Sequence, residues 1–523
     1  MGQALKLPSS GTGRLTHHPI LAVSAVLLGP FMVGFHSRLF GIGMVDLRGA
    51  FGLGVDEAAW LNTLATAPQI VLAPSVAWLS AAFGIRRVMV VPALLYGAIS
   101  LAIPLTRDFD ILAILHVIHG ALLGIFVPAT LIIIFRNLPV KWWISAIAIY
   151  AFRGAFTANA GTALLDFYVQ HLGWQWLYWQ DVILAPIMAA LAFFGAPRES
   201  INRDLIQRAD WGGMLLLGTG LALLFMGADQ GNRLDWFESG FVVTSVWGGT
   251  FLVLAFVINE EIVKHPWAGI GTIGVRDIVL LFAIALLYLI SGLSNTTLIP
   301  NYLTTVAQLR PEQIGATLLY WSCIPLIIMT PVVVWALHRT DGRLLLLVGL
   351  CCFAWAALLG TGLTSEWNGD SFQTMCVLQG AGHILTFLPI IVLIVANGDP
   401  KRAIALTAYI QVLRLLGTEA AQALMTTYIR KGEQLHSYLA GLSLQKGSET
   451  VVSALAAMTQ KLAGAGLSTS QARAVSVLSQ QVQKQAYVLS YIDAFGLTFG
   501  CAVIAIIILV FVGKAPRGPL TAN

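Results

Sequence analysis

The stretch PILAVSAVLLGPFMVGFHSRLFGIGMV, residues 19–45, is an apolar run that contains two ionisable side chains, His36 and Arg38. Because a helix of about 20 residues crosses the hydrocarbon core of a bilayer, this run is long enough to span a membrane. An arginine in the middle of a spanning helix costs about 3 kcal/mol on insertion scales, so such side chains usually face a bundle interior or a water-filled cavity. We therefore expect His36 and Arg38 to line a central cavity. The alternative is that Arg38 reaches the outer interface or pairs with a carboxylate such as Asp46.

The composition of the chain predicts an integral membrane protein. Over 523 residues, 57% are hydrophobic and 11% are charged, far below the charged fraction of about one quarter in soluble domains. The apolar runs have the length of spanning helices and lack the alternation of a membrane barrel, so the predicted fold is all-α. The five cysteines form no CxxC pair, and we expect neither a metal site nor a cofactor. The net charge of +5 does not indicate a nucleic-acid partner.

Fourteen apolar segments are candidate spans. The loops that an inside start places in the cytoplasm carry most of the Lys and Arg residues, so both termini are predicted to be cytoplasmic. The predicted spans are residues 19–42, 57–82, 88–106, 110–135, 142–165, 174–196, 211–229, 239–259, 277–300, 315–337, 343–364, 373–396, 402–428 and 488–513.

An internal repeat divides the chain. Gly84-Ile85-Arg86-Arg87 corresponds to Asp341-Gly342-Arg343, and His119-Gly120 corresponds to Gln379-Gly380, at an offset near 258 residues. The same offset pairs His36 and Arg38 with Ser294 and Thr296. Repeated halves with a site between them at mid-membrane are typical of secondary transporters. The predicted divisions are a cytoplasmic tail 1–18, a six-helix half 19–209, an inserted helix pair 210–260, a second six-helix half 261–513 and a cytoplasmic tail 514–523.

A long external segment precedes the last span. Within residues 430–487, apolar side chains recur at three- and four-residue steps in 448–462 and 470–488, with Ala463-Gly464-Ala465-Gly466 between them. This pattern predicts a helical hairpin outside the membrane, in the periplasm if the chain starts inside. Such a hairpin would either cap the cavity or dock a partner protein.

The chain resembles the major facilitator superfamily, and within it the fourteen-span drug:proton antiporters of the EmrB/QacA type. The resemblance covers nearly the whole chain and depends on the order of four short motifs together with the long external segment. The motifs are Gly173-Trp174-Gln175-Trp176-Leu177-Tyr178, Asp210-Trp211-Gly212-Gly213, Asp235-Trp236-Phe237 and Arg414-Leu415-Leu416-Gly417. The resemblance implies proton-driven export across a bacterial inner membrane, with a periplasmic adaptor protein and an outer-membrane TolC-type channel as partners.

Several positions depart from the family pattern. Ala77 and Ala81 replace the glycine and aspartate of the motif after the second span, which weakens its charge relay. The surviving members of this motif and of its repeat are the predicted gating residues, although they could act only as positive-inside anchors. They are Gly84, Arg86, Arg87, Asp341 and Arg343. In the fourth span, His116 stands where the family has an arginine.

The resulting charge pattern of the core is basic, which favours an amphipathic anion as cargo. Predicted substrate-binding residues are His36, Arg38, Arg153, Arg414, Phe35, Phe156, Ser294 and Thr296. Predicted proton-coupling residues are Glu419, Asp181 and His116, since buried carboxylates and histidines can exchange protons near neutral pH. A broad exporter of cationic drugs is the alternative function, and a non-transporting membrane sensor or enzyme is a second alternative. No nucleophile motif accompanies the histidines, so the protein is not predicted to be an enzyme.

Overall fold

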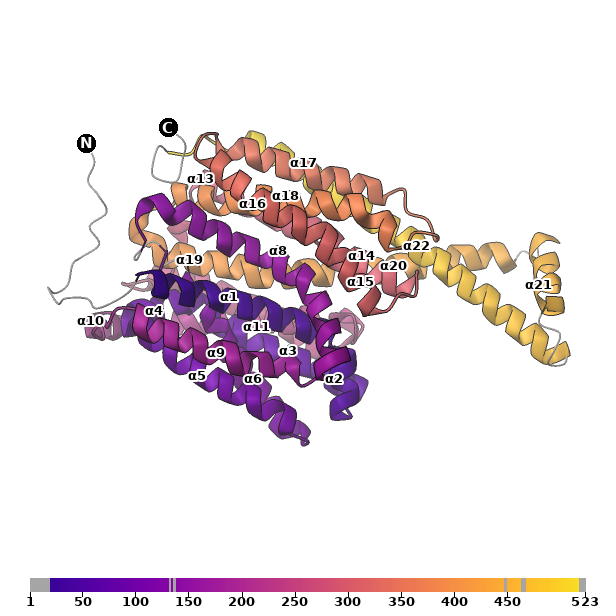
Figure 1. Ribbon diagram of the computed structural model, residues 1–523, viewed down its shortest axis with the longest axis horizontal. Coiled ribbons are helices and arrows are strands. Elements are labelled where there is room, and N and C mark those ends of the chain that lie inside the picture. Colours follow the sequence, from indigo (N-terminus) through magenta and orange to yellow (C-terminus); the bar gives the residue numbers. More distant parts are fainter. Residues whose placement is uncertain (1–18, 131–132, 135–137, 446–448, 462–466, 517–523) are drawn as a thin grey trace.

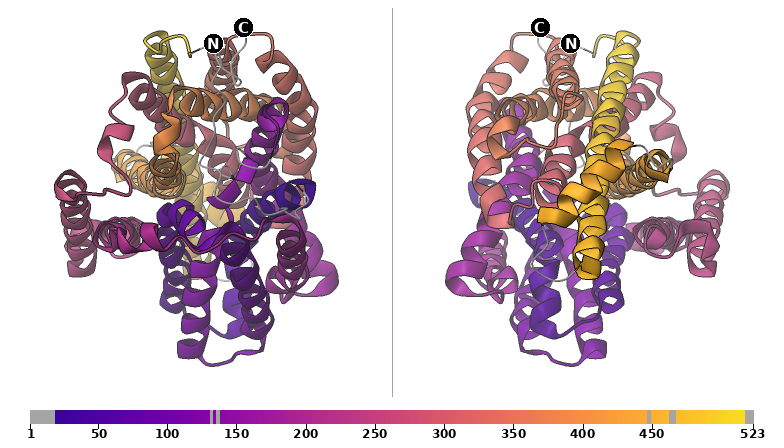
Figure 2. Two further views of the ribbon diagram at one scale, coloured as in Figure 1. Left: turned by 90° about the vertical axis from the view of Figure 1, so that its left-hand side faces the viewer. Right: turned by 90° about the vertical axis from the view of Figure 1, so that its right-hand side faces the viewer.

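The structure is a computed structural model that describes residues 19–130, 133–134, 138–445, 449–461 and 467–516. These residues form helices joined by short connections, and most helices run along the long axis of the molecule (Figure 1). The first and second parts of the chain form two groups, which the end-on views of Figure 2 show as purple helices on one side and orange and yellow helices on the other. The tail 1–18 and the end of the tail 514–523 lie outside the described residues.

The N-terminal half contains six long helical segments. Gly84, with φ of +83°, makes the sharp turn between the second and third, in a backbone region that favours glycine. Asp108 caps the fourth by accepting hydrogen bonds from the N–H groups of Asp110 and Ile111. The helices are α1 (Pro19–Ile42), the short α2 (Met44–Phe51), α3 (Val55–Leu72) continued by α4 (Val76–Phe83), α5 (Ile85–Ala102), α6 (Phe109–Phe126), α8 (Trp143–Phe167) and α9 (Trp176–Gly195).

The C-terminal half follows the same order, and three of its spans contain a π-helical turn. Such turns widen a helix locally and are frequent at functional sites. The helices are α13 (Arg276–Leu293), η7 (Ser294–Leu298) and α14 (Ile299–Thr305); α15 (Pro311–Leu318), η8 (Leu319–Cys323) and α16 (Ile324–Leu337); α17 (Gly342–Gly360); α18 (Gln373–Asn397); α19 (Ala403–Val412), η11 (Leu413–Gly417) and α20 (Thr418–Gln445); and α22 (Leu467–Val510).

Gly120 and Gly380, paired by the predicted repeat, make matching contacts in the two halves. A Cβ atom on Gly120 would lie 1.9 Å from the carbonyl oxygen of Ala65 in α3, and one on Gly380 would lie 2.3 Å from that of Ser322 in η8. Only glycine allows helix backbones to approach so closely. The repeat in the sequence therefore corresponds to equivalent helix packing.

The inserted pair, α11 (Trp211–Gly231) and α12 (Gly240–Ile262), stands beside the two halves (Figure 2). Its helices meet where a Cβ on Gly220 would lie 3.1 Å from the carbonyl oxygen of Gly249. α11 also contacts α3, since a Cβ on Gly218 would lie 2.6 Å from the carbonyl oxygen of Val71. Before α11, the loop after α9 contains the short α10 (Arg203–Gln207).

Within the described residues, twelve helices are long and apolar enough to cross a membrane. The two predicted spans outside this set, 142–165 and 402–428, are also helical, as α8 and as α19 to α20. The first is less apolar because it contains Arg153 and Asn159, and the second because it contains Arg414 and Glu419. The number fourteen remains a prediction.

The segment predicted to be external is helical and extends from the bundle. α20 and α22 project together beyond the other helices, and α21 (Glu449–Lys461) lies at their tip, at the end of the molecule opposite α10 (Figure 1). Two of the linkers, 446–448 and 462–466, lie outside the described residues. The last span is thus the second part of the helix α22, which begins in the projecting segment.

At the α10 end of the bundle, buried apolar side chains from both halves form one continuous core. They include Met89 of α5 and Ile147 of α8 from the first half, and Leu281 of α13 and Leu393 of α18 from the second. This packing joins the halves at that end of the molecule.

Candidate functional site

A cavity of about 1210 Å³ lies between the two halves. Its wall at the α10 end consists of buried side chains such as Ile391, Ile394 and Ile410. Its wall at the opposite end includes the exposed residues Val45 and Val55, beside α2. The cavity is therefore closed by the shared core at the α10 end and opens at the α2 end.

Three buried or half-buried arginines line this cavity, Arg38 of α1, Arg153 of α8 and Arg414 of η11, and the exposed Arg48 of α2 lines it at its open end. Arg38 donates through Nη1 to the carbonyl oxygen of Thr296 and through Nη2 to Oγ1 of Thr162, each at 3.3 Å. Each of the three arginines retains a buried nitrogen without a hydrogen-bond partner in the described part of the chain: Nε of Arg38, Nε of Arg153 and Nη2 of Arg414.

The polar contacts of Arg153 and Arg414 are also with neutral groups. Arg153, 7% exposed, donates to the carbonyl oxygen of Pro30 at 3.4 Å. Arg414 donates through Nε to Oε1 of Gln411 at 2.8 Å. Among the described residues, no carboxylate forms an ion pair with any of the three arginines. The alternative pairing of Arg38 with Asp46 is not found.

Two carboxylates face the same cavity. Glu419, in the first turn of α20, was predicted from the sequence; Asp229, near the end of the inserted helix α11, was not. Asp229 accepts hydrogen bonds from Asn62 at 3.1 Å, from Thr63, and from Gln230 at 3.3 Å. A lone carboxylate near the end of an apolar inserted helix was the signal in the sequence that could have identified it.

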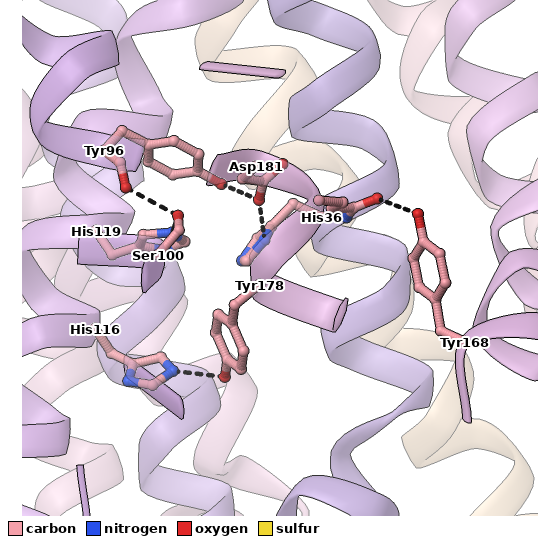
Figure 3. Close-up of polar contacts among 9 residues, drawn as sticks. His36, Tyr96, Ser100, His116, His119, Tyr168, Tyr178 and Asp181 are labelled. Atoms are coloured by element: carbon pink, nitrogen blue, oxygen red, sulfur yellow. Dashed lines mark hydrogen bonds and ion pairs between the residues drawn. The ribbon is translucent and has the colours of Figure 1, made fainter. Parts of the chain in front are cut away.

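Asp181 lies behind the cavity wall, in a buried network inside the N-terminal half (Figure 3). Its Oδ2 is 2.9 Å from Nδ1 of His36 and accepts a hydrogen bond from the hydroxyl of Tyr96 at 2.8 Å. The ring of Tyr96 stacks on His119 at 4.1 Å between centroids, and Nε2 of His119 is 2.9 Å from the hydroxyl oxygen of Ser100. His36 and His119 also reach the cavity.

His116 lies at one side of the same network and does not line the cavity. Its Nε2 is 2.9 Å from the hydroxyl oxygen of Tyr178, and its Nδ1 is 2.8 Å from the carbonyl oxygen of Leu112 (Figure 3). His36, His119 and Asp181 place three possible metal-ligand atoms within 4.8 Å of one another. Imidazole and carboxylate could hold a transition metal, but in this arrangement they hydrogen-bond to one another and to hydroxyl groups.

Three of the predicted cargo contacts are not part of the cavity wall. Phe35 and Phe156 pack edge to face against each other, with centroids 6.1 Å apart. Ser294 is fully buried and donates to the carbonyl oxygen of Ser291 at 2.7 Å. Thr296, two residues further along, does line the cavity, as does Asn295 between them. Gln379 and His383 of α18 also line it and were not predicted.

The predicted gating residues lie at the α10 end, away from the cavity. Arg87 donates to the carbonyl oxygens of Phe83 at 3.0 Å and Glu199 at 2.9 Å, while the guanidinium of Arg86 lies 3.7 Å from the ring centroid of Phe193. These contacts fix the turn at Gly84 against the loop after α9.

In the second half, Arg343 pairs with Asp341 at 2.8 Å and donates to the carbonyl oxygen of Val512 at 2.9 Å. Partial burial raises the pKa of the Asp341 carboxyl, but the hydrogen bonds and charge of Arg343 outweigh this effect and hold the pKa below its usual value. The pair therefore stays ionised at neutral pH and links the α16–α17 turn to the end of α22.

The two helical halves are joined at one end around a cavity, and the cavity opens at the other end. This is the architecture of a secondary membrane transporter. The family model of the Major Facilitator Superfamily matches residues 26–421. The chain belongs to this superfamily, and the resemblance inferred from its motifs is confirmed.

The relatives of the chain agree with this assignment. Over 526 residues, the chain is 21% identical to the Multidrug export protein EmrB of Haemophilus influenzae, covering 98% of this chain and 99% of that protein. It is 20% identical to the Fatty acid resistance protein FarB of Neisseria gonorrhoeae, covering 94% and 95%. Among solved structures, the proton:xylose symporter XylE bound to 6-bromo-6-deoxy-D-glucose has a TM-score of 0.56 at 11% identity, covering 95% of this chain and 96% of that one, and shares the fold.

Proposed function

We propose that this protein is a multidrug-type exporter that expels amphipathic organic anions from the cytoplasm in exchange for protons. One observation carries the choice of cargo: three buried or half-buried arginines line the cavity, and none of them pairs with a carboxylate in the described part of the chain. An unpaired cation within a membrane protein is costly, and a bound carboxylate, sulfonate or phosphate would relieve that cost.

The cavity also suits the apolar body of such a cargo. At about 1210 Å³, it exceeds the range of about 300–1,000 Å³ that is usual for small-molecule sites. Apolar side chains, including Leu289, Leu293 and Phe387, share its wall with the arginines. The relative named a fatty acid resistance protein fits a cargo with a long apolar body and one acidic group.

Glu419 is the first candidate for proton exchange, because it lines the cavity together with Arg414 and forms no ion pair among the described residues. A carboxylate that faces a cavity opening to each side of the membrane in turn can take up a proton on one side and release it on the other. Asp181 is the second candidate, since His36 connects it to the cavity. His116 is the third; it hydrogen-bonds to the hydroxyl of Tyr178, whose ring contacts that of His36.

We further propose that the membrane is the bacterial inner membrane, with the α10 end in the cytoplasm and residues 430–487 in the periplasm. The projecting hairpin then docks a periplasmic adaptor that leads to an outer-membrane TolC-type channel. Leu435 is 55% exposed, Tyr438 is 64% exposed and Val475 is 53% exposed on this hairpin, and apolar side chains in such positions favour protein contact. Since α21 lies beyond the bundle, docking is favoured over capping of the cavity (Figure 1).

The test is transport by the purified protein in proteoliposomes. With an imposed pH gradient, we expect uphill movement of a fatty acid anion such as laurate, accompanied by proton flux in the opposite direction. Vesicles that contain the Arg38→Gln, Arg153→Gln, Arg414→Gln triple variant serve as the matched control. Laurate movement that is independent of the gradient, or equal in the two preparations, would contradict the proposal.

An exporter of cationic drugs is the second candidate function, and it is favoured by the carboxylates of Glu419 and Asp229 in the cavity. The same vesicles discriminate between the two. Selective, gradient-driven movement of a permanent cation such as tetraphenylphosphonium, without movement of laurate, would assign the cavity to cations.

A further inference from the structure

Asp229 reaches the cavity from the inserted helix pair, which lies outside both halves. It is located two residues before the end of α11, in the polar sequence Asp229-Gln230-Gly231-Asn232-Arg233. The remainder of α11 is apolar and packs against α3 and α12. Helix packing therefore does not explain why α11 has a carboxylate at the cavity wall.

The carboxylate of Asp229 is held in place by neutral donors. Asn62 donates to Oδ1, and Thr63 and Gln230 donate to Oδ2. The nearby Arg233 donates to Oε1 of Gln230 at 2.6 Å and pairs with Asp56. Within the described residues, Asp229 therefore has hydrogen bonds but forms no ion pair of its own, although the charge of Arg233 lies near it.

The end of α11 is also attached to the other half of the protein. Asn232 donates to Oγ1 of Thr426 and accepts from the hydroxyl of Thr427, each at 3.0 Å, and Arg430 donates to its carbonyl oxygen. These residues belong to α20, whereas Asn62 and Thr63 belong to α3. The segment is fixed from both sides, so Asp229 has a defined position between the halves.

The cavity consequently contains unpaired charges of both signs. In the part of the chain that is described, Arg38, Arg153 and Arg414 line it without forming an ion pair, and so do Asp229 and Glu419. Gln379, only 2% exposed and also in the wall, has no hydrogen-bond partner for either of its amide atoms there. Buried polar atoms are normally hydrogen-bonded, so these groups indicate a polar ligand.

We propose that Asp229 binds the positive group of the cargo while the arginines bind its negative group, so that the cavity selects amphipathic zwitterions. This inference rests on the proposed export through the cavity and defines its substrate class more narrowly. A pocket that bears both signs without an ion pair between them, in the described part of the chain, is complementary to a molecule whose own charges are separated. Molecules with a single charge leave one side of such a pocket desolvated and unpaired, which lowers their affinity.

The experiment compares three ligands with one scaffold. A fluoroquinolone with a free carboxyl and a free piperazine amine is zwitterionic; its methyl ester is cationic and its N-acetyl derivative is anionic. We would measure binding of each to the purified full-length protein in nanodiscs. For the Asp229→Asn variant, Kd is expected to rise at least tenfold for the zwitterion and the ester and to stay within twofold for the N-acetyl derivative.

Two control variants separate charge from position. Asp166→Asn removes a carboxylate of α8 that does not line the cavity, and no Kd is expected to change. Asn232→Ala breaks the link to α20 but keeps the Asp229 charge. For this variant, Kd for the amine-bearing ligands should rise no more than Kd for the N-acetyl derivative, or much less than it does for Asp229→Asn. Equal weakening of all three ligands by Asp229→Asn, no weakening, or the absence of zwitterion binding to the unsubstituted protein would overturn the proposal.

The Arg38→Gln variant distinguishes a failure of the zwitterion inference from a failure of the proposed anion export. If Arg38→Gln weakens the N-acetyl derivative while Asp229→Asn changes nothing, anion binding stands and the zwitterion inference is wrong. If Asp229→Asn weakens the ester while Arg38→Gln leaves the N-acetyl derivative unaffected, the assignment to organic anions is wrong.

Discussion

Arg38 of α1 donates a hydrogen bond through Nη1 to the backbone carbonyl oxygen of Thr296 in η7, at 3.3 Å, across a sequence separation of 258 residues. These two residues occupy corresponding places in the two repeated halves. Their contact crosses the boundary on which a rocking motion of the halves would act. A carbonyl oxygen only partly satisfies a guanidinium, and Nε of Arg38 has no partner among the described residues.

Replacement of Arg38 by glutamine should weaken binding of anionic cargo. We expect the apparent Kd for laurate to rise at least about tenfold, or about 1.4 kcal/mol, because the charge that binds the carboxylate is lost. Neutral analogues such as dodecanol should be affected much less. Arg38→Lys should recover only part of the affinity, since an ammonium cannot form two parallel hydrogen bonds to a carboxylate. Equal losses for acid and alcohol in equilibrium binding would identify Arg38 as a structural residue.

Replacement of Glu419 by glutamine should uncouple transport from the proton gradient. Glutamine keeps the size and hydrogen-bonding capacity of the side chain but cannot release a proton. We expect loss of uphill export in proteoliposomes and retention of downhill counterflow. Glu433→Gln, on the projecting part of the same helix, is the matched control and should alter neither activity. Uphill export at the unsubstituted rate would remove Glu419 from the coupling mechanism.

The projecting hairpin should be accessible from the periplasm. A cysteine in place of the exposed Ser476 should react with a membrane-impermeant maleimide in spheroplasts with an intact inner membrane. A cysteine in place of the exposed Gln207, in α10, should react only after the membrane is broken. The unsubstituted protein controls for the native cysteines. The reverse labelling pattern would invert the proposed orientation.

Alanine at Gly120 should destabilise the N-terminal half. The added Cβ would lie 1.9 Å from the carbonyl oxygen of Ala65, so α6 and α3 must separate. Overpacking of this kind costs about 1–3 kcal/mol, and the midpoint of thermal unfolding in detergent should fall. Gly380→Ala should act in the same way in the second half. Gly500→Ala, where nothing lies within 4 Å of the new Cβ, should leave the midpoint unchanged or raise it. A midpoint for Gly120→Ala equal to that for Gly500→Ala would show that the helices can adjust without loss.

The sequence was sufficient to predict the segments that form helices and the residues that share a depth in the membrane. Apolar runs set the spans, and the repeat offset placed Arg38 opposite Thr296, because two homologous helices hold corresponding residues at the same height. The periodicity of residues 448–462 and 470–488 likewise coincides with α21 and the first part of α22.

The direction in which a side chain points was decided only by the tertiary structure. In a spanning helix, both the lipid face and the packed face are apolar, so the pattern that reveals the buried side of a soluble helix is weak. The sequence therefore could not tell that Phe35 and Phe156 pack behind the cavity wall while Glu419 faces the cavity. It also could not place Asp229, because the inserted pair has no counterpart in the repeat. The contacts of α11 with α3 and α20 carry that carboxylate to the site.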